Sequence, residues 1–301
     1  MKRNILYIVA IIIGLSFAFS SCDVIDSPYV EKQEIDTSFN CVTPDFPTVQ
    51  SPYKRVLLED YTGHLCVNCP KAALIASDLK ARYKDTLVVV AVHAGFFANP
   101  AGGYDFRTTC GTEWDDYFKV GLNGNPNGMI NRLKYLEGAH VYQPSAWGNG
   151  IKEAKNATPE VELQVINDYD AELDNLCIHT KTTFLTPISN RALNLNIVII
   201  QDKIIAPQHN NDPNIGTTPT IEDYEHNHVL VGAVNGTWGT PILSADETSA
   251  DPIIKTFPVH VKGVNTINTP VPENCTVVAF ISDLNTREIL QVTECKVVIN
   301  E

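Results

Sequence analysis

The sequence predicts an α/β domain followed by an all-β domain, because the spacing of its apolar residues changes near residue 158. Before this position, short β-branched runs alternate with stretches in which apolar residues recur at helical spacing. After it, apolar and polar residues alternate, as is typical of half-buried strands. Roughly 280 residues follow a predicted signal peptide, which is enough for two domains. We therefore predict one domain over residues 51–158 and a second over residues 159–301.

The first domain is expected to begin with a buried strand at Val56–Leu58, and a second buried strand is expected at Leu87–Val92. Between them, apolar residues recur at the spacing of an amphipathic helix: Ala72, Ile75, Leu79 and Tyr83. The remaining elements that we expect are a helix at 113–120, strands at 128–132 and 136–142, and a helix at 144–155 capped by Ser145.

The second domain is expected to contain seven short strands joined by turn-rich connections. They are predicted at residues 161–165, 178–185, 193–197, 229–234, 257–261, 276–282 and 289–292. This pattern is typical of an all-β, immunoglobulin-like sandwich.

The amino terminus has the features of a bacterial signal peptide. Lys2 and Arg3 precede an uncharged run, Ile5–Phe19, and small residues stand directly before Cys22. The run of about 15 residues is too short to span a bilayer comfortably, although an uncleaved anchor helix is the alternative. We therefore predict a signal peptide over residues 1–21, acylation of Cys22, attachment to a membrane through this lipid, and a polar tether over residues 22–50.

The charge of the mature chain narrows the choice of partner. Removing residues 1–21 takes two basic residues away, so 20 Lys and Arg remain against 35 Asp and Glu, a net charge of −15. Such an acidic protein is a poor ligand for nucleic acid, so we expect no nucleic-acid partner. No cofactor-binding motif is found, and we expect no cofactor.

Eight cysteines are present, and seven remain when Cys22 carries lipid. An exported protein meets oxidising conditions, so pairs are expected, and the odd number leaves at least one thiol free or transiently paired. We predict a disulfide between Cys275 and Cys295, because residues 283–287 form a turn signal and positions opposed across that turn sum to about 570. The sequence leaves the pairing of Cys41, Cys110 and Cys177 open.

The strongest local motif is Cys66-Val67-Asn68-Cys69-Pro70, at the junction of a predicted strand and helix. A helix N-terminus stabilises a thiolate, and the pKa of such thiols is commonly about 3.5–7.5. We therefore predict that Cys66 is the more exposed, attacking thiol and that Cys69 resolves the mixed disulfide. A structural disulfide is the main alternative, and a zinc half-site would need a second close cysteine pair, which the sequence lacks.

The segment Asp60–Cys69 resembles the active-site strand and loop of thioredoxin-like proteins. The resemblance implies a thioredoxin-like domain in which Asp60 is a buried acid that assists proton transfer to the resolving thiol. It also implies that Asn125-Pro126 is the loop beside the pair, with a cis peptide bond at Pro126. Leu65 replaces the usual tryptophan, so the redox potential and the substrate do not carry over.

A longer resemblance covers the chain from about residue 50 to its end. It is carried by Val56–Gly63, Cys66–Pro70, Val92–Gly95, Asn131-Arg132 and Asp223–Leu230. These segments resemble the outer-membrane-protein-28-related lipoprotein family of Bacteroidetes. The resemblance implies a thioredoxin-like domain, a β-sandwich domain and an outer-membrane location, but it implies no settled activity.

Two functions follow from these motifs. The first is thiol–disulfide exchange on exported protein thiols, with Cys66, Cys69, Asp60 and Pro126 as the site. The second is a surface-binding or adhesin-like lipoprotein, in which the same fold is a scaffold and the cysteine pair is structural. Among nearby histidines, His64 could favour the Cys66 thiolate as a cation, while His226 and His228 alternate but are expected to bind no metal.

Overall fold

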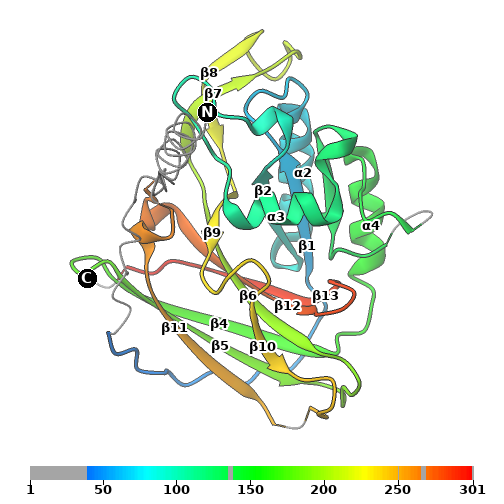
Figure 1. Ribbon diagram of the computed structural model, residues 1–301, viewed down its shortest axis with the longest axis vertical. Coiled ribbons are helices and arrows are strands. Elements are labelled where there is room, and N and C mark those ends of the chain that lie inside the picture. The colour runs from blue at the N-terminus through cyan, green and yellow to red at the C-terminus, as the bar shows by residue number, and fades with distance from the viewer. Residues whose placement is uncertain (1–38, 135–137, 250, 266–268, 300–301) are drawn as a thin grey trace, which may run out of the picture. The chain divides into compact units, whose positions relative to one another are not determined.

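The structure is a computed structural model, and it describes residues 39–134, 138–249, 251–265 and 269–299. The first part of the described chain forms β1 (Val56–Thr62), α2 (Cys69–Tyr83), β2 (Leu87–His93), α3 (Thr109–Phe118), β3 (Asn127–Ile130) and α4 (Trp147–Ala154). The second part forms β4 (Val161–Asp170), β5 (Asn175–Phe184), β6 (Leu193–Gln201), β7 (Ile204–His209), β8 (Thr220–His226), β9 (Val229–Ala233), β10 (Thr240–Leu243), β11 (Ile253–His260), β12 (Cys275–Asp283) and β13 (Ile289–Lys296). The protein is therefore a mixed α/β structure with a β-rich second part, as Figure 1 shows.

An eight-stranded mixed sheet runs through the molecule in the order β13-β12-β6-β9-β2-β1-β3, with β10 paired to β6 (Figure 1). β1 and β2 are parallel and are connected through α2, whereas β3 is antiparallel to β1. β5 pairs with β11 and β4 in a separate three-stranded sheet, and β7 and β8 form a hairpin.

Helices cover both faces of the sheet at β1 and β2, and all seven residues of each strand are buried. On one face, α3 packs Trp114 into the core that contains Val90. On the other face, α2 and α4 pack Ala76 and Trp147 into the core that contains Val89. Burial on both faces explains why these strands are continuous apolar runs in the sequence.

A third core lies between the three-stranded sheet and the β6–β12 part of the large sheet. Ile197 of β6 and Ala279 of β12 contribute to this core together with Leu163 of β4. The next residues along, Val198 and Phe280, belong instead to the core beneath α3. Alternate residues of these central strands therefore face two different cores, as the pleat requires.

The strands on both sides of residue 158 belong to the same large sheet. β2 pairs with β9 through Ala91 and Val229, and the backbone N–H of Ala91 donates to the His228 carbonyl at 2.8 Å. The change in periodicity at residue 158 thus marks a change in element type, and the hydrogen-bonded sheet continues across it. The assignment of two domains stays a prediction.

All seven strands expected in residues 159–301 are present, together with three that were not predicted: β7, β8 and β10. Two local predictions in the first part are wrong. Residues 138–142 form no strand, and Tyr142 makes only an isolated bridge to Gly128. Ser145 does not cap a helix, because Pro144–Ala146 form a 3₁₀ turn and α4 begins after Ala146.

The predicted disulfide between Cys275 and Cys295 is absent, and both residues are free cysteines. In the β12–β13 pair, Val277 lies opposite Cys295, two positions away from the register that would place Cys275 there. The register shifts between Ile281 and Ser282, which displaces the outer part of the hairpin from the turn-centred register. On the turn side of this shift Ser282 already lies opposite Ile289, one position away from the assumed register, and the shift adds a second position. Cys275 and Cys295 are therefore not opposed, and the prediction is wrong.

The described part of the predicted tether lies against the three-stranded sheet. Cys41 is bonded to Cys177 of β5, and their Cα atoms are 5.5 Å apart. Farther along, the Pro47 carbonyl accepts a hydrogen bond from the Gln164 side chain at 2.9 Å. The signal peptide, Cys22 and residues 23–38 lie outside the described residues. Within the described part of the chain, no helix has the length and apolar character needed to cross a membrane.

Candidate functional site

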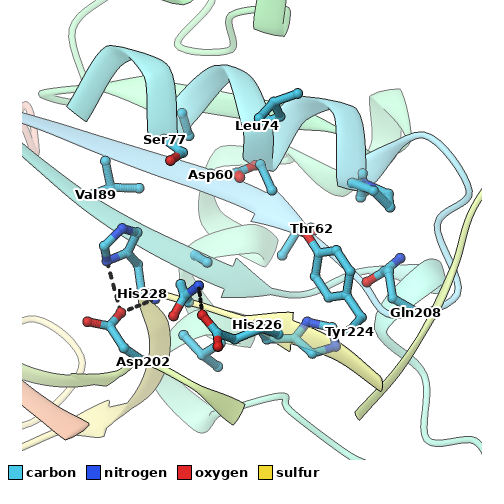
Figure 2. A pocket seen from close by; sticks show the side chains of 18 of the residues that line it. Asp60, Thr62, Leu74, Ser77, Val89, Asp202, Gln208, Tyr224, His226 and His228 are labelled. Atoms are coloured by element: carbon cyan, nitrogen blue, oxygen red, sulfur yellow. Dashed lines mark hydrogen bonds and ion pairs between the residues drawn. The ribbon is translucent and has the colours of Figure 1, made fainter. Parts of the chain in front are cut away.

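A cavity of about 640 Å³ lies beside the first half of α2, and Figure 2 shows its lining. One wall is α2 from Cys69 to Ser77, and another is formed by the carboxyl-terminal parts of β1 and β2. Residues 224–229, from β8 to the start of β9, form a third wall. The cavity therefore joins the predicted redox site to a segment from the second half of the chain.

Cys66 and Cys69 form a disulfide at the start of α2, as the motif predicts, with Cα atoms 5.4 Å apart. The geometry follows from the local sequence, because Pro70 occupies the first helical turn, where a missing N–H costs no hydrogen bond. Each cysteine is 2% exposed. The prediction that Cys66 is the more exposed of the two is therefore wrong.

The β7–β8 hairpin explains this burial, because it is hydrogen-bonded to the segment that carries the pair. Five hydrogen bonds join residues 208–211 to residues 63–68. The donors and acceptors are Gln208 Nε2 to the carbonyls of Gly63 (3.3 Å) and Cys66 (2.9 Å), His209 N to the His64 carbonyl (2.8 Å), Asn211 N to the Val67 carbonyl (3.2 Å), and Asn211 Nδ2 to Asn68 Oδ1 (2.9 Å). The hairpin thus holds both ends of the loop that leads into α2.

Asp60 lies where the resemblance to thioredoxin-like proteins places the buried acid. It is 3% exposed and lines the same cavity as Cys69. Its Oδ1 atom is buried and has no hydrogen-bond partner within the described structure. Burial raises the pKa of the Asp60 carboxyl to about 7, so this group exchanges a proton near neutral pH.

Pro126 follows a cis peptide bond to Asn125, as predicted. Asn125 Nδ2 donates to the carbonyls of Thr62 at 2.9 Å and Ala94 at 3.0 Å, which fixes this loop at the carboxyl ends of β1 and β2. Pro126 is not among the residues that line the cavity. The structure therefore brings Asp60 and Cys69 to one cavity and holds the Pro126 loop at the end of the same two strands.

Three buried histidines that are far apart in the sequence surround Phe106. The rings of His64, His93 and His226 have centroids 5.8, 5.0 and 5.2 Å from that of Phe106. Both ring nitrogens of His64, Nδ1 of His93 and Nε2 of His226 are buried without a partner within the described residues. Sequence spacing gives no sign of this cluster, because only the pairing of β2 with β9 brings His93 and His226 together.

These histidines are neutral at pH 7. Burial lowers the pKa of His226 to about 4 and lowers that of His93 well below 6.5. Burial also lowers the pKa of His64, with a smaller contribution from His209, which disfavours a cationic His64 beside the Cys66 thiolate. His226 and His228 line the same cavity, and the His228 ring pairs with Asp202 at 3.1 Å. Within the residues described, no group of three or more His, Cys, Asp and Glu side chains is arranged to hold a metal ion.

Comparison with solved structures shows a related overall fold. HBP35 of Porphyromonas gingivalis is 17% identical, with a TM-score of 0.60, and the match covers 82% of this chain and 76% of that one. A protein from Agrobacterium tumefaciens is 11% identical, with a TM-score of 0.49 and coverage of 83% and 98%. A domain of the outer membrane lipoprotein Omp28 from Porphyromonas gingivalis is 20% identical, with a TM-score of 0.31 and coverage of 48% and 93%. No curated protein matches the chain.

Comparison with family models gives the more specific result. The model described as outer membrane protein Omp28 matches residues 113–301, which is well over half of the chain. The match begins within α3 and includes the cis-proline loop, the β7–β8 hairpin and the whole β-rich part. It confirms the family resemblance and the outer-membrane location that the sequence motifs predict. The chain therefore belongs to the outer membrane protein Omp28 family of outer-membrane lipoproteins.

Proposed function

We propose that this outer-membrane lipoprotein, anchored by lipid on Cys22, carries out thiol–disulfide exchange through Cys66 and Cys69. The observation that supports this proposal best is that Asp60, a buried acid whose pKa is about 7, lines the same cavity as Cys69. We further propose that β1, α2, β2 and β3 form a thioredoxin-like unit and that the β-rich part is an immunoglobulin-like sandwich. The parallel β1–α2–β2 arrangement, with the cysteine pair at the start of α2, supports the first of these assignments.

The burial of Asp60 destabilises the folded protein, which favours a chemical role for this residue. Burying a carboxyl group without a hydrogen bond to each oxygen destabilises a protein, and a structural disulfide needs no titratable group beside it. Groups with pKa values shifted by burial occur preferentially at functional sites. An acid that titrates near neutral pH can accept a proton from one partner and return it to another.

The proposed reaction begins with the reduced pair. The Cys66 thiolate attacks a substrate disulfide, forms a mixed disulfide and releases one substrate thiolate. Asp60 then accepts the proton of Cys69, and the resulting thiolate attacks the Cys66 sulfur. The mixed disulfide breaks and releases the second substrate thiol, so the pair is oxidised by two electrons and the substrate is reduced by two. The substrates we propose are thiols and disulfides of exported proteins.

Both cysteines are buried, and the β7–β8 hairpin is hydrogen-bonded to the segment that carries Cys66, so access to Cys66 requires movement of the hairpin. Gln208→Ala removes the amide that donates to the carbonyls of Gly63 and Cys66. Each lost hydrogen bond is worth about 1 kcal/mol, so we expect reduction of the Cys66–Cys69 bond by dithiothreitol to become about 5–30 times faster. The reduction is stopped at successive times with an alkylating reagent. Mass spectrometry of the alkylated cysteines then gives the rate.

Asn227→Ala is the matched control for Gln208→Ala. Asn227 makes its side-chain hydrogen bonds at the other end of the hairpin, to Lys203 N and Glu225 Oε1. Its replacement should leave the reduction rate unchanged. Equal rates for all three proteins would show that the hairpin does not control access to the pair.

The reaction itself is tested by trapping. We expect Cys69→Ser to accumulate mixed disulfides with envelope proteins, because the attacking thiol remains and the resolving thiol is lost, whereas Cys66→Ser should trap few. In the wild-type protein the resolving step should speed up as pH rises through about 7, where Asp60 becomes the ionised proton acceptor. Asp60→Asn should be slower and should lose this pH dependence. If neither cysteine variant traps a partner and the potential of the pair is below about −300 mV, the bond is structural.

A second candidate function is ligand binding by a redox-inert protein. The closed position of the hairpin and the cavity of about 640 Å³ favour it, since ligand pockets for small molecules have about this volume. In that case the Cys66–Cys69 bond would hold the loop before α2 in place, and the surface-binding interpretation of the sequence would be the better one.

A further inference from the structure

We infer that the cavity beside α2 binds a small organic ammonium ion, with the charged group against Asp60 and an apolar part against α2. This binding does not depend on the redox state of the cysteine pair or on the proposed exchange reaction.

The charge of the lining selects a cation. Among the 21 described residues that line the cavity, three are carboxylic acids, Asp60, Asp202 and Glu225, and none is lysine or arginine. The lining histidines His93 and His226 are neutral at pH 7, because burial lowers the pKa of each. The third histidine of the lining, His228, already pairs with Asp202, so an anionic ligand would find no free cationic partner there.

Of the three carboxylic acids in the lining, Asp60 is the one that we infer binds the ligand. Asp202 Oδ1 accepts from the backbone N–H of His228 at 2.7 Å and lies 3.1 Å from its ring, and Glu225 Oε1 accepts from Asn227 at 3.0 Å. Asp60 is almost fully buried, and its Oδ1 has no partner within the described structure. Figure 2 shows Asp60 between α2 and the segment that carries Tyr224 and His226. A ligand ammonium group there would supply the missing hydrogen bond and the missing counter-charge.

The other residues of the lining determine the apolar part of the ligand. Ala73, Leu74 and Ala76 of α2, Val89 of β2 and Val229 of β9 present an apolar surface to the cavity. The Tyr224 ring lies close enough to Asp60 for its charge to affect the Tyr224 hydroxyl, and an aromatic ring favours a nearby cation. This combination fits a primary amine on a short alkyl or aryl group better than an inorganic cation, for which the described residues offer no ligand cluster.

Binding should depend on pH through Asp60. The other titratable groups of the lining are Cys69, His93, Tyr224, Glu225, His226 and the paired residues Asp202 and His228. Cys69 is in a disulfide, burial raises the pKa of Tyr224 to about 12, and burial lowers the pKa of His93 and of His226. Asp202 is paired with His228, and Glu225 accepts a hydrogen bond from Asn227, so Asp60 is the acid of the lining without a partner for one of its oxygens. The pKa of Asp60 is about 7, so the ionised form that pairs with an ammonium group prevails above this value. The dissociation constant should be about tenfold larger at pH 6 than at pH 8.

The test is isothermal titration calorimetry with hexylammonium, hexanol and hexanoate. The protein is the full mature chain in its oxidised form, without added thiol. We expect hexylammonium to bind at least ten times more tightly than hexanol, and hexanoate to bind more weakly still. Asp60→Asn should remove the preference for hexylammonium and the pH dependence, while Asp223→Asn, which changes an exposed carboxylate of β8 outside the lining, should change neither.

A second variant keeps the test independent of the stability of Asp60→Asn. Ala73→Phe adds volume at a half-buried cavity position and should weaken hexylammonium binding at least tenfold without removing a charge. Equal binding of hexylammonium and hexanol, tighter binding of hexanoate, or equal losses in Asp60→Asn and Asp223→Asn would overturn the inference. Exchange is measured separately by trapping, so loss of one function does not decide the other.

Discussion

Arg132→Ala should lower the free energy of unfolding by about 3–5 kcal/mol, the largest effect that we expect from a single replacement. Arg132 is fully buried, and its Nε and Nη2 atoms donate to Glu59 at 3.0 and 2.8 Å. Its guanidinium carbon lies 4.6 Å from the centre of the Trp114 ring and 5.3 Å from that of Phe280. Truncation would leave the Glu59 carboxylate buried without its counter-charge and would open a space between the aromatic rings.

Urea unfolding followed by tryptophan fluorescence measures this loss. Arg107→Ala is the control, because the ion pair of Arg107 with Asp105 is more exposed and should contribute about 0–1 kcal/mol. Replacing both members of the buried pair, Glu59→Gln with Arg132→Met, should recover part of the stability, since no charge is then left unpaired. A loss below about 1 kcal/mol for Arg132→Ala would mean that the buried pair contributes no more than a surface pair.

Replacing Cys41 and Cys177 together by alanine should lower the free energy of unfolding by about 2–5 kcal/mol. The bond joins residues 136 positions apart, so it removes much conformational freedom from the unfolded chain. It also holds the irregular segment before β1 against β5.

Thermal and urea unfolding under oxidising conditions check the second prediction. Cys295→Ala removes a half-buried free cysteine and should cost much less, so it controls for the loss of a sulfur atom. Unchanged unfolding of the double variant would show that the bond adds no stability to the folded chain.

The elements that the sequence predicts correctly are those whose apolar pattern is decided by burial. Helices cover both faces of β1 and β2, so these strands are continuous apolar runs. The helical spacing of α2 likewise marks the face that it packs against them. The positions of Asp60 and Cys69 follow from the same strand and helix, so the centre of the candidate site could also be predicted.

The parts that the sequence does not predict depend on contacts between distant segments. In β8 only His226 is buried, and one of the two buried residues of β7 is the polar Gln208. The sequence of neither strand therefore shows the apolar–polar alternation that marks a half-buried strand. Hydrogen bonds to residues 63–68 hold this hairpin, and they also explain why Cys66 is covered. The sequence also gives no sign of the Cys41–Cys177 bond, because Cys41 lies in a segment without periodicity.

The place of β9 beside β2 has a consequence for the order of folding after export. The amino-terminal strands are translocated first, yet the neighbour of β2 is a strand from late in the chain. Until β9 (Val229–Ala233) has been translocated, one edge of β2 has unpaired N–H and C=O groups that another strand could bind. Pairing between such distant segments is slow, so the newly exported chain passes through a stage in which this edge of β2 is unpaired.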